Sequence, residues 1–303
     1  MTVLSIVIPS WNTRDLLRTC LRTVEAARKP GETEIVIVDN ASHDGSADMV
    51  AEEFPEVVLQ RNAANEGFAI GCNQGIALAR GEYVLLLNAD TEVGEDALVR
   101  MVDFLREHPD YGGVAPRLLN PDGSTQRSCQ AFPKLATVFW FATPFERWFP
   151  DSKEMRRYFL RDWDHEDERD IDQPPAACLM ITRRVIEEVG VFDESLWLFY
   201  NDVDLSLRMH QHGLRTRFLP QATVLHHVGA STSQFGSFLT MWQKNRLTYY
   251  RKHHGRLAGV WLKACVSLAF VDWCCIQLKA KLRRRGGEPL WTTTQAWLRY
   301  LAL

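Results

Sequence analysis

The stretch EYVLLLNAD, Glu82 to Asp90, is a short apolar run that ends in Asn-Ala-Asp. Three earlier runs have the same form, and they are LSIVIP (Leu4–Pro9), EIVIVDN (Glu34–Asn40) and VVLQRN (Val57–Asn62). The segments between the four runs have the spacing of helices, and they are Arg14–Ala27, Gly45–Glu53 and Gly67–Ala79. Short buried strands that alternate with helices are typical of βαβ units. We therefore predict an α/β fold with a mostly parallel sheet flanked by helices.

Polar residues follow the predicted strands at Ser10-Trp11-Asn12, Asp39-Asn40 and Asn88-Ala89-Asp90. In open α/β sheets, ligands bind beyond the carboxyl ends of the strands. Neither G-x-G-x-x-G after the first strand nor G-x-x-x-x-G-K-[ST] occurs, so both common phosphate loops are missing. A divalent cation that bridges carboxylate and phosphate oxygens can hold a diphosphate instead. Asp90 is placed to supply that carboxylate, although an Asp after a strand also commonly caps a turn.

Composition restricts the class of protein. The chain has 303 residues, 46% of them hydrophobic, which is typical of a globular protein with a sizeable core. Its net charge of -3 argues against nucleic acid as a partner, because such binding needs a dominant basic field. The seven cysteines form no C-x-x-C pair and no zinc spacing, which favours a reducing, cytoplasmic compartment. The start, MTVLSIVIPSWN, lacks the pattern of a signal peptide.

Several motifs occur in a fixed order along the chain. SIVIPSWN, IVIVDNASHDGS and NEGFAIGCNQGIALARGEYVLLLNAD resemble the nucleotide-sugar half of glycosyltransferase family 2, which has the GT-A fold. GVAPRLLNPDGSTQRSCQAFP, ACLMITRRVIEEVGVFDESLWLFYNDVDLSLR and HHVGAST resemble its rhamnosyltransferase-like branch. The resemblance implies a GT-A domain over residues 1–255, with a nucleotide-sugar half at 1–115 and an acceptor half at 116–255. A helical segment over residues 256–303 follows it.

The resemblance also implies roles for individual residues. The residues that it places around the nucleotide-sugar donor are Pro9, Asn12, Asp39, Asn65, Gly67 and Asn73. Asn88 stands at the first position of the DXD motif, and Asp90 matches its second acid, a ligand of Mg²⁺ or Mn²⁺. Gly71 and Gly75 recur at four-residue spacing after Gly67, and we interpret these two as sites of close helix packing.

Glycosyl transfer from a nucleoside diphosphate has two chemical needs. The charge of the departing diphosphate must be neutralised, which a metal does as a Lewis acid. The attacking hydroxyl must lose its proton to a positioned base. One carboxylate in the second half of the chain is sufficient for an inverting displacement. The candidates are Asp162-Trp163-Asp164, in an acidic run interpreted as a solvated and mobile loop, and Asp202-Val203-Asp204.

The pattern from Asn201 onward predicts a helix with Leu205 and Met209 facing inward. Asp204 has Arg208 four residues later, and we interpret this pair as a surface ion pair.

Asp202 has Ser206 at that spacing and no cation. A carboxylate at a helix N-terminus is held in its ionised form by the helix dipole, so we predict that Asp202 is the catalytic base. The resemblance agrees, because Asp202 matches the second residue of the family's Glu-Asp motif. Two positions depart from the family pattern: Asn201 replaces the usual Glu but can still cap the helix, and Ala176 replaces a frequent Gly.

His226 and His227 end a strand-like run, ATVLHH, at a position that the resemblance assigns to the metal shell. Aligning the motif from Ser231 favours His226 as the ligand, with His227 as the alternative. A histidine in the core with satisfied hydrogen bonds is the simpler interpretation of either residue.

The last part of the chain indicates membrane contact. The segment Ala131–Pro150 is rich in aromatic residues and fits either the core of a helical subdomain or a lipid-facing surface. Leu257–Leu278 is apolar, but Lys263 and Asp272 interrupt it, which disfavours a spanning helix. A basic cluster follows at Lys279, Lys281, Arg283, Arg284 and Arg285. An amphipathic helix beside a basic cluster predicts an in-plane anchor on the anionic inner face of the cell membrane. A subunit interface is the alternative.

Together these observations predict an inverting, metal-dependent glycosyltransferase that uses a nucleoside-diphosphate sugar. The branch indicates dTDP-rhamnose as the donor and a cell-surface polysaccharide or a lipid-linked glycan as the acceptor. The alternatives are a UDP-hexose-dependent transferase of the same family and a non-catalytic nucleotide-binding scaffold.

Overall fold

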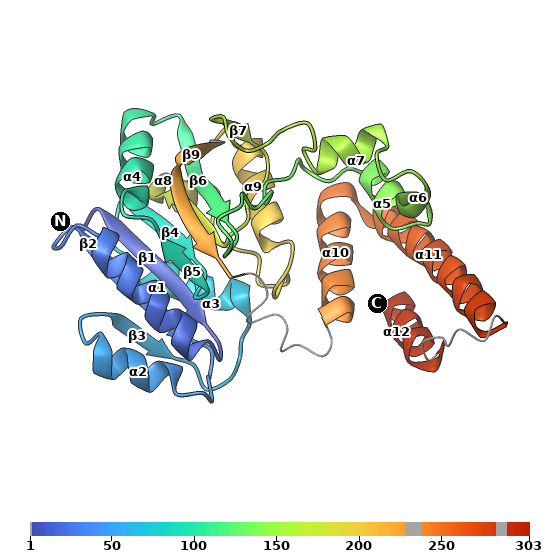
Figure 1. Ribbon diagram of the computed structural model, residues 1–303, viewed down its shortest axis with the longest axis horizontal. Helices are drawn as coiled ribbons and strands as arrows, with labels where there is room; N and C mark the ends of the chain where they lie inside the picture. The colour runs from blue at the N-terminus through green and yellow to red at the C-terminus, as the bar shows by residue number, and fades with distance from the viewer. Residues whose placement is uncertain (1, 228–237, 283–289) are drawn as a thin grey trace. The chain divides into compact units, whose positions relative to one another are not determined.

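The computed structural model describes residues 2–227, 238–282 and 290–303 (Figure 1). The chain forms two compact units, which are described separately. We call the first the sheet unit, and it comprises Met1–Gln130 and Trp163–Gly236. We call the second the helical unit, and it comprises Ala131–Asp162 and Ser237–Leu303. The predicted boundary at residues 255 and 256 does not coincide with this division, because the helical unit is built from two separate stretches of chain.

The sheet unit alternates strands and helices along its first half. Its elements are β1 (Leu4–Ser10), α1 (Arg14–Ala27), β2 (Thr33–Asp39), α2 (Ser46–Glu53), β3 (Val58–Arg61), α3 (Phe68–Leu78), β4 (Tyr83–Leu87), β5 (Thr91–Val93), α4 (Ala97–Glu107), β6 (Tyr111–Leu119), β7 (Arg169–Ile171), β8 (Cys178–Thr182), α8 (Arg183–Glu188), α9 (Asn201–Gln211) and β9 (Arg215–His226). The four strands and three helices predicted for the first ninety residues are all present, and their ends shift by a few residues at most.

Within the described residues, nine strands form one sheet in the order β3-β2-β1-β4-β8-β6-β9-β5, and β7 pairs with β9. β1 pairs in parallel with both β2 and β4, and Ile6 lies opposite Ile35 on one side and Leu85 on the other. β8 is antiparallel to both β4 and β6, whereas β6 and β9 are parallel. The predicted α/β fold is confirmed. The sheet is parallel from β3 through β2 and β1 to β4, and it is mixed beyond β4, so it is less parallel than we predicted.

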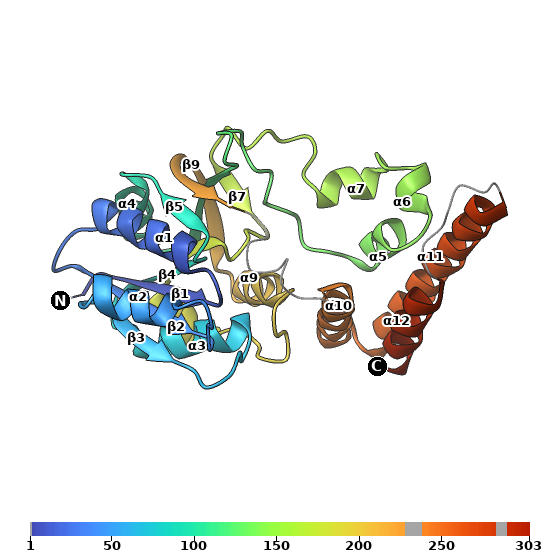
Figure 2. The ribbon, with the colours of Figure 1, turned by 60° about the horizontal axis from the view of Figure 1, so that its bottom comes forward.

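Alternate residues of the central strands supply two apolar layers, one on each face of the sheet. Ile6 and Ile8 pack with α1, α2 and α4, whereas Val7 packs with α3, α8 and α9. Figure 2 shows α1 and α4 on the side of the sheet opposite α3. A Cβ at Gly75 would lie 2.3 Å from Val7 Cγ1, so this helix position needs glycine for close contact with β1. The sheet is therefore buried on both faces, which leaves its strand ends to carry polar chemistry.

We expected the acidic run after Asp162 to be a solvated, mobile loop. Most of its acidic side chains are exposed, as expected, but the run is packed against the sheet unit. Trp163 is buried, and its ring stacks on His165 with centroids 3.8 Å apart. The run continues into β7, which pairs antiparallel with β9. Asp170 forms ion pairs with Arg215 and Arg217 of β9. Glu168 and Asp170 are thus paired with a basic strand that the local sequence does not reveal.

The helical unit contains α5 (Leu135–Phe141), α6 (Phe145–Trp148), α7 (Lys153–Tyr158), α10 (Phe238–His254), α11 (Arg256–Leu282) and α12 (Leu290–Ala302). The two stretches of chain pack against each other, because the Phe139 and Trp261 rings stack and Trp261 Nε1 donates to the Leu135 carbonyl at 3.1 Å. Tyr249 and Tyr250 of α10 are buried. The predicted basic cluster at Arg283, Arg284 and Arg285 and the side chain of Lys281 lie outside the described residues.

Candidate functional site

The carboxyl ends of β1, β2 and β4 meet at one edge of the sheet. Ser10, the last residue of β1, lies opposite Asp39, the last residue of β2. Asn88 follows β4 directly, and its N–H donates to the Ala177 carbonyl at 2.9 Å. Polar residues that are far apart in the sequence are therefore brought together at the edge where α/β proteins bind ligands.

A pocket opens at this edge between the end of β1 and the start of α3. The residues that line it are Pro9, Ser10, Trp11, Asn40, Asn65, Gly67, Phe68, Trp197 and Leu198. The predicted donor residues Pro9, Asn65 and Gly67 are thus brought together. Trp197, from the second half of the chain, also lines the pocket, and the sequence analysis did not predict it.

Trp197 forms one wall of the pocket and packs directly on Gly67. A Cβ at Gly67 would lie 2.3 Å from Trp197 Nε1, and Gly67 has a φ of +95°, so no other residue fits without strain. The N–H groups of Phe68 and Ala69 donate to the Trp197 carbonyl at 2.9 and 3.3 Å. The loop before α9 is therefore anchored to the first turn of α3.

Asn12 and Asp39 do not line this pocket, but each is the chain neighbour of a residue that does, and both bind the backbone of the loop after β2. Asn12 has a φ of +51°, its Oδ1 accepts from the His43 N–H at 2.7 Å, and its own N–H donates to Ser42 Oγ at 2.9 Å. Asp39 is 3% exposed, and its Oδ2 accepts from the Ser42 N–H at 3.0 Å. Its Oδ1 is buried and has no hydrogen-bond partner among the described residues. A buried carboxylate oxygen without a donor is costly, so this oxygen can accept a hydrogen bond from a ligand.

Asn65 and Asn73, both predicted to lie beside the donor, form hydrogen bonds to different parts of the sheet unit. Asn65 Oδ1 accepts from the Gly67 N–H at 3.0 Å and holds the turn into α3. The Asn73 amide donates to the Phe192 carbonyl at 3.0 Å and accepts from the Phe192 N–H at 3.0 Å. Asn73 therefore holds a loop of the second half of the chain, and it is not among the pocket-lining residues.

Asp90 and His226 form the second part of the site. Asp90 Oδ1 lies 3.5 Å from His226 Nε2, and both side chains are largely buried. His227 Nε2 lies 2.7 Å from Glu92 Oε1 instead. Adjacent side chains on a strand point to opposite faces, so only one of the two histidines can face Asp90. Residues 228–232 of the HHVGAST motif lie outside the described residues.

A divalent cation would find only part of its shell in these side chains. Among residues 2–227, 238–282 and 290–303, no three His, Cys, Asp or Glu side chains form a group that could hold a metal alone. Asp90 and His226 offer one oxygen and one nitrogen on converging side chains. This donor set fits a metal whose other ligands come from the diphosphate and water, as hard divalent cations commonly have.

Asp202 lies in the first turn of α9. Its Oδ1 accepts from the Val203 N–H at 2.8 Å, and its Oδ2 accepts from the Ala176 N–H at 3.4 Å. Burial raises the pKa of this carboxyl above its ordinary value, and the backbone donors only partly oppose that change. We expected the helix dipole to keep this carboxylate ionised at neutral pH. Loss of hydration opposes the dipole and is the largest cause of the change in pKa, and the ionised state at neutral pH stays a prediction. A pKa moved toward neutrality suits proton acceptance better.

The Asp204 side chain is fully buried, so the prediction of a surface ion pair is wrong. Arg208 Nε donates to Asp204 Oδ2 at 2.8 Å. The other guanidinium nitrogens of Arg208 donate to the Val189 and Val191 carbonyls at 2.8 and 2.7 Å. The pair thus holds the loop that leads to Trp197.

Asn201 is 2% exposed and clasps the same loop from inside. Its Nδ2 donates to the Leu198 carbonyl at 3.0 Å and to the Leu196 carbonyl at 3.4 Å. Its Oδ1 accepts from the Asp202 N–H at 2.8 Å. A glutamate has no N–H to offer the two carbonyls. The amide at this position therefore has a structural task that the family's usual acid could not perform.

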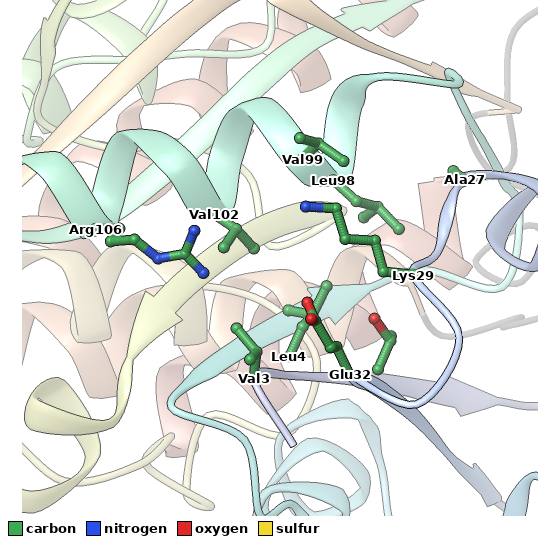
Figure 3. Close-up of a pocket in the computed structure, with 10 residues that line it drawn as sticks. Val3, Leu4, Ala27, Lys29, Glu32, Leu98, Val99, Val102 and Arg106 are labelled. Carbon is green, nitrogen blue, oxygen red and sulfur yellow. The ribbon is translucent and has the colours of Figure 1, made fainter. Parts of the chain in front are cut away.

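A second pocket lies at the amino end of β1, away from this edge. Figure 3 shows it between α4 and the turn after α1, where Lys29, Glu32 and Arg106 stand beside apolar side chains. None of the predicted site residues lines it. We therefore assign the site to the carboxyl edge of the sheet.

The fold is that of the GT-A glycosyltransferases. The structure is similar to the mannosyltransferase PcManGT from Pyrobaculum calidifontis, solved with GDP-Man and Mn²⁺, with a TM-score of 0.57 and 18% identity. That match covers 99% of this chain and 85% of the other. It is also similar to S. aureus TarS 1-349, solved with UDP, with a TM-score of 0.55 and 13% identity over 99% of this chain and 71% of that one.

The chain belongs to glycosyl transferase family 2. The family model, described as "Glycosyl transferase family 2", matches residues 5–190. A curated relative is the N-acetylglucosaminyl-diphospho-decaprenol L-rhamnosyltransferase of Mycobacterium tuberculosis (strain ATCC 25618 / H37Rv). It is 29% identical over 213 residues, which are 66% of this chain and 68% of the relative. This similarity supports the predicted rhamnosyltransferase-like branch.

Proposed function

We propose that this glycosyltransferase transfers a sugar, with inversion, from a nucleoside diphosphate to a glycan or lipid-linked acceptor. The observation that carries the proposal is the link between Asp202 and the end of β4. Asp202 accepts from the Ala176 N–H, and the carbonyl of the next residue, Ala177, accepts from the Asn88 N–H. The candidate base and the candidate diphosphate site are thus joined through two consecutive residues.

Asp202 would act as the general base of a single displacement. The acceptor hydroxyl transfers its proton to an Asp202 carboxylate oxygen as its oxygen bonds to the anomeric carbon. The bond from that carbon to the diphosphate breaks, and its electron pair leaves with the nucleoside diphosphate. The raised pKa of Asp202 supports this role, because the protonated product of the step is less unfavourable in a buried carboxyl.

Asp90 and His226 would hold Mg²⁺ or Mn²⁺ at the diphosphate. When bound, the metal supplies Lewis-acid stabilisation of the charge on the departing diphosphate. Asp39 would receive an N–H or O–H of the nucleoside at its unpartnered oxygen. Pro9 and Trp197 would exclude water from the donor by packing on it.

The donor that we propose is dTDP-rhamnose, and the acceptor is a lipid-linked glycan or a cell-surface polysaccharide. The M. tuberculosis relative supports rhamnose as the sugar and a lipid-linked acceptor, since it is named an N-acetylglucosaminyl-diphospho-decaprenol L-rhamnosyltransferase. The experiment is a transfer assay with a panel of dTDP-, UDP- and GDP-sugars, each with Mn²⁺, Mg²⁺ or a chelator. We expect metal-dependent turnover that is highest with dTDP-rhamnose, and NMR should show an inverted anomeric centre. Binding without turnover of any donor would contradict the proposal.

We also propose that the protein is peripheral on the inner face of the cell membrane, through α11. Residues Arg256–Lys279 form a helix that is long and apolar enough, by length and composition, to cross a membrane. The two charged residues that interrupt its apolar sequence form contacts within the helical unit: Lys263 Nζ donates to the Leu301 carbonyl at 2.8 Å, and Asp272 pairs with Arg147 at 3.1 Å.

The opposite side of α11 is an exposed apolar stripe. Its large members are Leu257, Val260, Leu268, Val271 and Leu278, and the exposed residues Ala264 and Cys275 lie between them. The spacing of three and four residues supports one lipid-facing line along a helix that is packed on its other side. A helix in that arrangement lies in the membrane plane.

The stripe can be tested by point substitutions. Leu268→Glu with Val271→Glu should lower sedimentation with anionic phospholipid vesicles by about tenfold or more, since two large apolar side chains lose their burial. Val58→Glu, at a 43% exposed apolar position of the sheet unit, is the matched control and should bind like the unaltered protein. Equal vesicle binding by the double variant would contradict the anchor. A change from dimer to monomer in the same variant would support the subunit-interface alternative instead.

A further inference from the structure

A chain of hydrogen bonds leads from the turn after β6 to the ring of His226. The turn reads Asn120-Pro121-Asp122-Gly123-Ser124, and Gln126 follows it. Gly123 has a φ of +81°, and its N–H donates to the Asn120 carbonyl at 2.8 Å, which closes the turn. The Gln126 N–H donates to the Leu118 carbonyl at 2.8 Å, so Gln126 returns alongside β6.

The donor and the acceptor of each of these hydrogen bonds can be assigned by starting from Asp122, which is farthest from His226. The Asp122 carboxylate can only accept, and the Ser124 hydroxyl donates to it at 2.6 Å. This hydroxyl holds the pKa of Asp122 below its ordinary value, so the carboxylate is ionised at neutral pH. Ser124 Oγ has then used its one hydrogen and can only accept from Asn120 Nδ2 at 2.9 Å.

The same argument assigns the donors and acceptors between Asn120 and His226. Because Asn120 turns its Nδ2 to Ser124, its Oδ1 accepts from Gln126 Nε2 at 3.0 Å. Gln126 therefore presents its Oε1, an acceptor, to His226 Nδ1 at 3.0 Å. His226 Nδ1 must carry the hydrogen. In a neutral ring the hydrogen on Nδ1 leaves a lone pair on Nε2, the nitrogen that lies 3.5 Å from Asp90 Oδ1.

We propose that Gln126 is a positioning residue that sets His226 in the tautomer needed to bind a metal through Nε2. The inference rests on the proposed function, in which Asp90 and His226 hold the divalent cation. Metal-binding histidines commonly donate their other N–H to a fixed acceptor, and loss of that acceptor lowers metal affinity by about 10- to 100-fold. Here the acceptor is an amide whose own orientation is set by the Asp122 carboxylate through Ser124 and Asn120.

Two substitutions at position 126 separate positioning from simple packing. Gln126→Glu keeps an acceptor for His226 Nδ1 but cannot donate to Asn120. Gln126→Leu keeps the approximate volume and removes the acceptor. Gln221→Leu makes the same change at an exposed position of β9, the strand that carries His226, and is the matched control.

The first readout is the tautomer itself, measured without metal. In ¹⁵N-histidine-labelled protein at pH 8, long-range ¹H–¹⁵N NMR spectra distinguish a hydrogen on Nδ1 from one on Nε2. We expect the Nδ1–H form for His226 in the unaltered protein, in Gln221→Leu and in Gln126→Glu. In Gln126→Leu the hydrogen should move to Nε2, toward Asp90. The Nε2–H form in the unaltered protein would overturn the proposal.

The second readout is Mn²⁺ affinity with dTDP present, from the electron paramagnetic resonance of free Mn²⁺. Gln126→Leu should bind Mn²⁺ about 10- to 100-fold more weakly, and Gln126→Glu should stay within about threefold of the unaltered protein. Equal weakening by both substitutions would indicate packing alone and overturn the proposal. If the unaltered protein binds no Mn²⁺, the proposed function fails, whereas the NMR result still decides the tautomer.

Discussion

Restoring the family's acid at position 201 should damage this protein. Asn201 is buried, and its amide nitrogen supplies hydrogens to two backbone carbonyls of the loop that carries Trp197. In Asn201→Glu both carbonyls lose their donor, and a carboxylate enters the same buried space.

The magnitude follows from the two contacts. The bond to the Leu198 carbonyl at 3.0 Å is well formed, and the one to the Leu196 carbonyl at 3.4 Å is weak. A buried acceptor left unpaired costs about 1–3 kcal/mol, so Asn201→Ala should cost about 2 kcal/mol. Burial of the added charge in Asn201→Glu should bring the total to about 3–4 kcal/mol. At about 2–4 °C per kcal/mol for a unit of this size, the melting temperature should fall by roughly 10 °C.

The assay is a melting curve by circular dichroism together with the KM for the donor. The released loop carries Trp197 and Leu198, which line the pocket, so the KM should rise in both variants and more in Asn201→Glu. Asn201→Ala is the matched control, since it removes the same donor without adding a charge. An Asn201→Glu protein that melts at the temperature of the unaltered protein, with equal or higher turnover, would refute the reasoning.

Three further outcomes are expected. Asp202→Asn should lower kcat by about 10²-fold or more with little change in donor affinity, and near-normal turnover would remove Asp202 as the base. Asp90→Ala should abolish the rise in melting temperature that Mn²⁺ gives in the presence of dTDP, so an unchanged rise would exclude Asp90 as a ligand. Burial lowers the pKa of His165 to about 4 in the folded protein, whereas the ordinary pKa in the unfolded chain is about 6.5. Between about pH 6.5 and pH 4, His165 is therefore protonated in the unfolded chain and neutral in the folded protein, which favours unfolding as the pH falls. The free energy of unfolding should therefore fall by about 3 kcal/mol between about pH 6.5 and pH 4 because of His165. Urea unfolding at about pH 7 and about pH 4 measures the fall, and in His165→Phe the contribution of this histidine should be absent.

The local pattern of apolar and polar residues was sufficient to predict the fold of the first half of the chain. The helix predicted over Arg14–Ala27 has those bounds in the structure, because its apolar residues recur at helical spacing and pack on one face of the sheet. In α9, the predicted inward residues Leu205 and Met209 are both fully buried. The strand ends could be predicted as well, and with them the edge of the sheet that carries the site.

Contacts between distant segments account for what could not be predicted. Asp204 is buried and pairs with Arg208, whose guanidinium also donates to the Val189 and Val191 carbonyls. The spacing of four residues between Asp204 and Arg208 predicts an ion pair but does not show whether its carboxylate is buried. The pKa of Asp202 rises through burial by segments far away in the sequence. Asn73 is likewise held by Phe192, 119 positions later. The Asp202 role itself stays a prediction, since it rests on chemistry that only turnover can test.

The two-piece construction of the helical unit has a consequence for recombination between relatives. Phe139 and Leu135 contact Trp261 across 122 and 126 positions of sequence, yet they belong to one packed unit. A hybrid enzyme that exchanges only its last third would pair one parent's α5 with the other parent's α11. Residues at positions 139 and 261 should therefore change together among relatives. Productive hybrids should inherit both stretches, Ala131–Asp162 and Ser237–Leu303, from the same parent.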